Sequence, residues 1–95
     1  MAFLFTNQTS DADSVGHAPG GAATIHTTGT LDGAYLQVQI APSNVANLYE
    51  PPTGTNLNHI RVPGNVNVDA QGGYFVRVLL RGSAATTNVT VEVTP

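Results

Sequence analysis

The strict alternation of apolar and polar residues is the feature that most constrains the fold of this chain. In residues 34–40, AYLQVQI, the side chains of Leu36, Val38 and Ile40 fall on one side and the polar ones on the other. Residues 88–94, NVTVEVT, repeat this pattern with valine at every second position. A period of two is typical of a β-strand with one buried face, and apolar residues at helical spacing never continue beyond a turn or two. We therefore expect an all-β protein.

An Asp-Gly pair at 32–33 predicts a tight turn beside the first of these strands. Asp-Gly favours two-residue hairpin turns, because both residues tolerate positive φ. We expect residues 22–31 to form a strand and to pair with 34–40 across this turn.

The middle of the chain predicts further short strands. Residues 57–62 and 65–70 are strand candidates on either side of a Pro-Gly turn. Residues 47–56 contain adjacent prolines, which remove backbone donors and fix φ, so we expect a long irregular connection there. Together these segments predict a two-layer antiparallel β-sandwich, Ig-like or jelly-roll-like, of about six to eight short strands.

The N-terminus differs from the rest of the chain. Phe3, Leu4 and Phe5 form an apolar cluster, followed by a polar, glycine-containing stretch. We expect an N-terminal arm and linker at 1–20 and a β-sandwich domain at 21–95. At a reach of up to about 3.3 Å per extended residue, the arm could add to an edge strand of its own sheet or of a neighbouring copy. Exchange between copies would make the protein a homo-oligomer.

Residues 74–81, YFVRVLLR, predict a strand that is apolar on both faces. We expect this strand to form a hairpin with 88–94, which makes one face an aliphatic ladder. The same register sets Arg77 opposite Glu92 as a cross-strand ion pair.

Three residues on the outer face of that strand are left unexplained by the ion pair. Phe75, Leu79 and Arg81 are of types enriched in protein interfaces. Either a loop such as 42–56 or the N-terminal arm covers them, or a partner subunit does. The candidate partner-binding residues are Phe3, Leu4, Phe5, Phe75, Leu79 and Arg81.

Charge and cysteine content exclude several classes of function. Charged residues make up 9% of the chain, against roughly 25% in an average soluble protein. With a formal charge of −3 and three arginines as the only fixed cations, the chain lacks the basic surface that nucleic acid requires. Without cysteine it has no disulfide and no thiolate zinc site. The apolar N-terminal cluster is too short for a signal sequence or a membrane span, so we expect a soluble protein made in the cytoplasm.

No residue pattern predicts catalysis or a metal or cofactor site. His17, His26 and His59 lack metal-ligand spacing. Residues 10–14, SDADS, lack the glycine and glutamate of a calcium loop. The chain has neither a Gly-x-Ser-x-Gly nucleophile motif nor a glycine-rich loop that leads into a helix. We therefore expect that the protein is not an enzyme.

Two stretches, 20–44 and 68–93, resemble small β-sandwich virion proteins of tailed bacteriophages. The shared features are Gly33 at the turn, the strand at 74–81 and the valine-rich strand at 89–93. The resemblance implies a viral structural protein, either tail-associated or a capsid decoration (cement) protein. A decoration protein would bind the major capsid protein and stabilise the phage head. It would lie on the capsid surface of a virion assembled in the host cytoplasm.

A carbohydrate-binding or adhesive β-sandwich is the alternative. Sugars stack on exposed aromatic rings, and Tyr35 and Tyr49 could form such a platform together with Gln37 and Gln39. A tail- or neck-associated virion protein is a third possibility.

Overall fold

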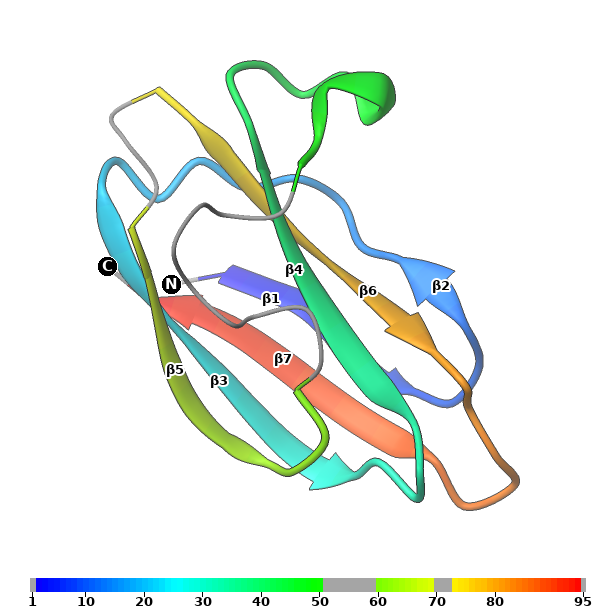
Figure 1. Ribbon diagram of the computed structural model, residues 1–95. Helices are drawn as coiled ribbons and strands as arrows, with labels where there is room; N and C mark the ends of the chain where they lie inside the picture. The colour runs from blue at the N-terminus through cyan, green and yellow to red at the C-terminus, as the bar shows by residue number, and fades with distance from the viewer. Residues whose placement is uncertain (1, 51–59, 70–72, 95) are drawn as a thin grey trace.

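The computed structural model describes residues 2–50, 60–69 and 73–94, and this part is an all-β fold of two antiparallel sheets. Figure 1 shows the two sheets packed one in front of the other. The expected two-layer antiparallel β-sandwich is thus confirmed. Its described elements are β1 (Ala2–Gln8), β2 (Ala12–Asp13), β3 (Ala22–Thr30), β4 (Tyr35–Ala41), the 3-10 turn η1 (Ala46–Leu48), β5 (Gly64–Asp69), β6 (Phe75–Arg81) and β7 (Asn88–Thr94).

Consecutive strands alternate between the two sheets along the described chain. The four-stranded sheet has the order β1-β7-β3-β5, and the three-stranded sheet has the order β2-β6-β4. No strand in this part therefore pairs with its neighbour in sequence, and each connection crosses from one layer to the other. Both expected hairpins, β3 with β4 and β6 with β7, are wrong.

The turn between β3 and β4 forms as expected, although the strands that it joins do not pair. Asp32 (φ 51°) and Gly33 (φ 83°) both have positive φ, and the Ala34 N–H donates to the Leu31 carbonyl at 3.0 Å. Leu31 and Ala34 are both buried in the core between the sheets. The turn therefore lies across the end of the sandwich and delivers β4 to the opposite layer.

The connection between β6 and β7 crosses the same end of the sandwich. Thr87 is buried there, and its hydroxyl donates to the Leu31 carbonyl at 2.9 Å and accepts from the Ala84 N–H at 2.9 Å. The Asp11 carboxylate accepts from the backbone N–H of Ser83 at 2.8 Å and of Gly82 at 3.3 Å. These contacts join three loops at this end of the molecule.

The expected ion pair between Arg77 and Glu92 is also wrong. Arg77 lies opposite Gln39 on β4, whereas Glu92 lies opposite His26 on β3. The two charges face outward from opposite sheets, because β6 and β7 belong to different layers.

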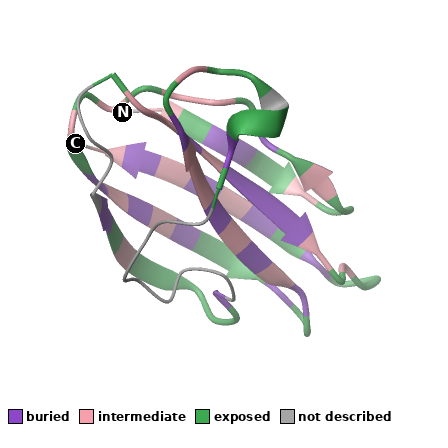
Figure 2. Ribbon diagram, turned by 45° about the horizontal axis from the view of Figure 1, so that its top comes forward, coloured by how far each residue is buried: buried purple, intermediate pink, exposed green. Residues whose placement is uncertain are grey.

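The buried core residues recur at about every second position along the strands. Figure 2 shows buried and less buried residues alternating along the strands. Each fully buried aliphatic side chain contributes roughly 1.5–3 kcal/mol relative to an exposed one. The residues with no solvent exposure include Ile25, Leu36, Val38, Val76, Val78, Leu80, Val89, Val91 and Val93.

The N-terminal segment is a strand of the sandwich, so the extended arm is not confirmed. β1 pairs with β7, and its register shifts between Phe3 and Phe5. Such a bulge adds one residue to the strand; here the consecutive Leu4 and Phe5 are both buried in the core. Phe3 pairs with Glu92 on the outer face and is 57% exposed.

The remaining strand predictions are settled only in part. The candidate at 65–70 corresponds to β5, whereas residues 57–59, with His59, lie outside the described residues. Ile60 forms an isolated bridge with Leu36. Of the expected irregular connection, residues 47–50 are described, and Glu50 bridges Ile40 on β4.

Candidate docking surface

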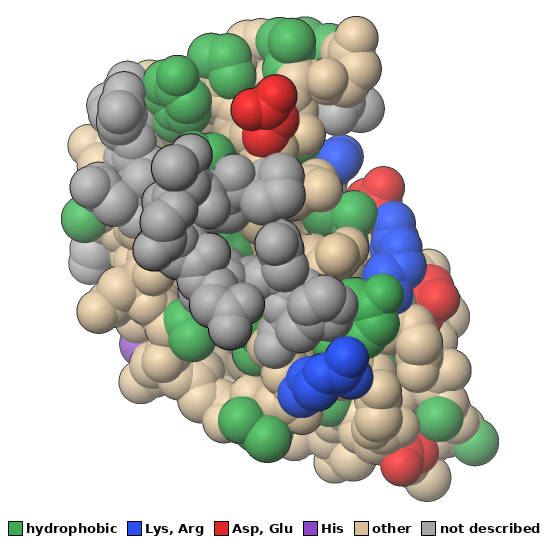
Figure 3. Space-filling view, in the orientation of Figure 1, with side chains coloured by type: hydrophobic (Ala, Val, Ile, Leu, Met, Phe, Trp, Pro, Cys, Tyr) green, Lys and Arg blue, Asp and Glu red, His purple; other side chains and the backbone are tan. Residues whose placement is uncertain are grey.

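The outer face of the three-stranded sheet gathers all three basic residues of the chain. Arg77 and Arg81 point outward from β6, because the residues that alternate with them are buried. Arg61 joins them over Tyr35, which faces outward from β4. Figure 3, which looks onto this sheet, shows the blue side chains on the right-hand side of the molecule. We call this surface the arginine face and define it by Asp13, Tyr35, Gln37, Gln39, Tyr49, Arg61, Phe75, Arg77, Leu79 and Arg81.

Arg77 is fixed by an amide and an aromatic ring. Its Nε and Nη2 donate to Gln39 Oε1 at 3.0 and 2.8 Å, and its Cζ lies 4.3 Å from the centroid of the Tyr49 ring. Tyr49 is only 9% exposed, and its hydroxyl donates to Asn44 Oδ1 at 2.8 Å. Burial raises the pKa of Tyr49 above 10.0, although the Arg77 charge acts in the opposite direction. These contacts hold the loop after β4 against the sheet.

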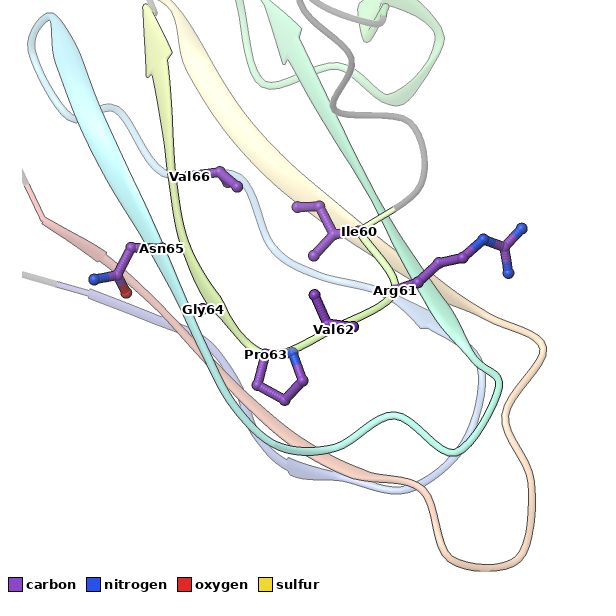
Figure 4. Close-up of a pocket in the computed structure, with 7 residues that line it drawn as sticks. All are labelled: Ile60, Arg61, Val62, Pro63, Gly64, Asn65 and Val66. Atoms are coloured by element: carbon purple, nitrogen blue, oxygen red, sulfur yellow. The ribbon is translucent and has the colours of Figure 1, made fainter.

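Arg61 forms a second, more open pair with a tyrosine. Its Cζ lies 5.2 Å from the centroid of the Tyr35 ring, and its side chain is exposed. Figure 4 shows Arg61 pointing away from the recess that residues 60–66 line, whereas Ile60, Val62 and Val66 point toward one another. The recess, of about 280 Å³, is therefore lined by the apolar side chains, and the guanidinium of Arg61 lies outside it.

Arg81 is neutralised within the protein. Its Nη2 forms an ion pair with Asp13 Oδ1 at 2.6 Å, and its Nη1 donates to the carbonyls of Ala12 at 3.3 Å and Leu80 at 2.9 Å. Arg81 thus fastens the short strand β2 to β6.

The structure brings together half of the six candidate partner-binding residues. Phe75, Leu79 and Arg81 share the arginine face, but Leu79 is 7% exposed, so the protein's own chain covers it. Leu4 and Phe5 are core residues rather than exposed partner contacts. Phe3, in β1, lies on the outer face of the other sheet.

Arg61 and Arg77 lie on this face but were not among the six predicted partner-binding residues. From the sequence, Arg77 was assigned to an ion pair with Glu92, and Arg61 was given no role. The outward position of Arg77 follows from its alternation with buried valines. No local pattern places Arg61, because its position depends on the chain crossing between layers at 60–64.

The sugar platform of the alternative role is partly covered by arginine side chains. Tyr49 is buried beneath Arg77, and the Tyr35 ring lies beneath Arg61. Gln39 is engaged by Arg77. Each ring already has a guanidinium group over it, which reduces the ring surface open to a sugar.

Apart from the exposed Phe3, the outer face of the four-stranded sheet is mainly polar, and several of its side chains hydrogen-bond to one another. The two ring nitrogens of His26 lie 2.7 Å from Asn65 Oδ1 and 2.9 Å from Thr94 Oγ1. Thr24 Oγ1 donates to Asn67 Oδ1 at 3.0 Å. Its polar groups are thus largely paired with one another.

Among residues 2–50, 60–69 and 73–94, no group of three or more histidine, aspartate or glutamate side chains could hold a metal ion. No helix in the same part of the chain is long and apolar enough to cross a bilayer. Comparisons with protein-family models, with curated proteins and with solved structures found no match to this chain.

Proposed function

We propose that the protein is a non-enzymatic structural protein of a phage virion. In this role it is a capsid decoration (cement) protein that binds the major capsid protein and stabilises the head. It lies on the capsid surface and docks there through the arginine face.

The arginine face is the observation that carries this proposal. Arginine, tyrosine and phenylalanine are enriched where proteins bind one another. Here Tyr35, Phe75 and the three arginines are all at least partly exposed on one layer of a body in which only 9% of residues are charged. The resemblance of residues 20–44 and 68–93 to small β-sandwich virion proteins supports the same role.

In this proposal the copies come together by binding to the capsid surface and not, as the sequence suggested, by exchanging their N-terminal segments. Leu4 and Phe5 fill the core of their own sandwich, so exchange of the N-terminal segment would first have to empty that core. Association through the repeated capsid surface does not require this step. Many copies on one particle also add their weak contacts into firm attachment.

The competing roles place the protein elsewhere or give it another ligand. A tail- or neck-associated protein could use the same face, and its copies would separate with tails rather than heads. A glycan-binding module needs open aromatic rings, and on this face both tyrosine rings contact arginines.

Particle association tests the proposal. Particles from cells that produce the virus encoding this chain are purified on a density gradient, and the chain is quantified against the major capsid protein. We expect co-sedimentation with heads at a fixed ratio. Particles made without the chain should break at a lower temperature and regain their stability when the purified protein is added.

Two results would contradict the role. One is a chain that stays with soluble proteins at the top of the gradient. The other is a chain that sediments with isolated tails and not with heads.

A further inference from the structure

The arginine face carries more positive charge than its own acids neutralise. The pair of Arg81 with Asp13 is the only ion pair within the described part of the chain. Arg61 and Arg77 contact tyrosine rings, and Arg77 also contacts an amide oxygen, all of which are uncharged. Within the described residues, Arg61 and Arg77 therefore lie on one face without a carboxylate partner, although the formal charge of the protein is −3.

We propose that the arginine face docks onto an acidic surface of its partner protein, and that Arg61 and Arg77 each receive a carboxylate of that partner. This inference rests on the proposed function and specifies the chemistry of the partner surface.

The two arginines are organised before binding. A guanidinium that stacks on an aromatic ring still points its N–H groups outward in its own plane. There they can form two parallel hydrogen bonds with a carboxylate. Arg77 directs two of its nitrogens to Gln39 Oε1, and the rest of its five N–H donors remain for a ligand. Because the tyrosines already order these side chains, binding costs less side-chain entropy than it would for free arginines.

Strand geometry sets the spacing of the carboxylates. Tyr35 beneath Arg61 and Gln39 beside Arg77 lie on the same strand, β4, and face the same way. A strand advances about 3.3 Å per residue, which puts these two positions roughly 13 Å apart. The partner surface should present acidic side chains at a similar separation.

A protein surface fits this face better than nucleic acid does. Nucleic acid presents dense negative charge, and a protein that binds it neutralises many phosphates. Two arginines that no carboxylate neutralises within the described residues are too few for that, on a protein of net negative charge. They suit a neighbouring protein with a few carboxylates, where charge complementarity sets orientation and the rate of association.

The test measures binding to purified particles that lack the chain. The full-length protein and four variants, R61Q, R61K, R77Q and E92Q, are added to these particles at about 50 mM and about 500 mM salt, a range over which screening increases strongly. Glu92 lies on the opposite sheet, so E92Q changes the charge by one unit away from the arginine face. Circular dichroism and melting temperature confirm folding, and R61Q serves if R77Q unfolds, because Arg61 is exposed.

We expect R61Q and R77Q each to weaken binding roughly tenfold or more at low salt, as for loss of a charged hydrogen bond. R61K should keep part of the affinity, E92Q should bind like the unaltered protein, and high salt should weaken the unaltered protein. The inference is overturned if the affinity for particles is the same at both salt concentrations, or if R61Q and R77Q bind as tightly as the unaltered protein. In either case the proposed function still stands. Absence of binding to particles at either salt concentration overturns the proposed function itself. Retention on double-stranded DNA as strong as on particles would also overturn the choice of a carboxylate partner.

Discussion

The guanidinium of Arg77 lies 4.3 Å from the centroid of the Tyr49 ring, and this contact joins β6 to the loop that follows β4. Tyr49 is buried there and bonds to Asn44. One side chain of the arginine face thus holds a loop in place and presents a charge to solvent.

A double-mutant cycle of Arg77→Gln and Tyr49→Leu tests this contact. We expect a coupling free energy of roughly 0.5–2 kcal/mol, the range for a partly desolvated cation–π pair. Denaturant unfolding of the single and double variants measures it. The matched control pairs Arg61→Gln with Tyr49→Leu, because Arg61 stacks on Tyr35 instead. Equal coupling in both cycles would contradict the specific pairing.

The loop after β2 should tolerate no side chain at Gly16. A Cβ there would overlap the Tyr49 hydroxyl and the Asn44 amide oxygen, so Gly16→Ala should destabilise the protein by about 1–3 kcal/mol, as overpacking does. The cost should shrink in a Tyr49→Phe background, which removes one of the two oxygens. Thermal unfolding is measured for the unaltered protein, the two single variants and the double variant. If Gly16→Ala lowered the stability equally with Tyr49 and with Phe at position 49, the overlap with the hydroxyl would not be the cause.

Gly29 and Gly20 allow backbone strain to be separated from a clash. Both have positive φ, 104° and 85°, but only at Gly29 would a Cβ meet the backbone, at the carbonyl of Asn88. Gly20→Ala should cost about 1–3 kcal/mol from φ strain alone. Gly29→Ala should cost clearly more, because neither β3 nor β7 can move away without losing its pairing. Similar unfolding free energies for the two variants would refute this difference.

Phe5 and Phe3 test whether the N-terminal strand belongs to its own core. Phe5 is buried and Phe3 is 57% exposed. We expect Phe5→Ala to cost about 3 kcal/mol or more and Phe3→Ala to stay within roughly 0.5 kcal/mol. Chemical denaturation at two protein concentrations provides the values. If Phe5→Ala changed only the concentration dependence and not the stability, the strand would instead dock on another copy.

Asp11 should make stability depend on pH in the acid range. The backbone N–H and hydroxyl of Ser83, with help from the Gly82 N–H and the Arg81 charge, lower the pKa of Asp11 below its ordinary value of 3.8. Because the folded protein takes up this proton less readily than the unfolded chain, the stabilisation is complete above the ordinary pKa. It is lost as the pH falls through the lowered one. Asp11→Asn should therefore have a lower free energy of unfolding than the unaltered protein at neutral pH. Denaturant unfolding at a series of pH values should show this difference in free energy becoming smaller in acid. A difference in unfolding free energy that stays constant down to the pH of acid unfolding would contradict this role.

Five of the seven described strands, β3 to β7, could be predicted from the sequence, but their partners could not. Alternation placed Leu36, Val38 and the valines of β7 in the core, since burial on one face is a local property of a strand. The Asp-Gly turn was also predicted correctly. Whether a turn joins strands of one sheet or of two depends on the burial of Leu31 and Ala34 at its ends, and that depends on the opposite layer.

The candidate site shows the same limit. Phe75, Leu79 and Arg81 were placed on one face correctly, because residues two apart in a strand share a face. Leu4 and Phe5 were assigned to a partner because the bulge that turns both inward has no clear mark in the sequence. The pairing of Arg61 with Tyr35 joins segments far apart in the chain, and only the crossing between the layers brings them together.

A cryo-electron microscopy map of the decorated particle would test the central claim most directly. We predict that the sheet β2-β6-β4 faces the capsid subunit and that Arg61 and Arg77 each lie within hydrogen-bond distance of a carboxylate of that subunit. A map in which the four-stranded sheet contacts the capsid and the arginine face points into solvent would contradict the account.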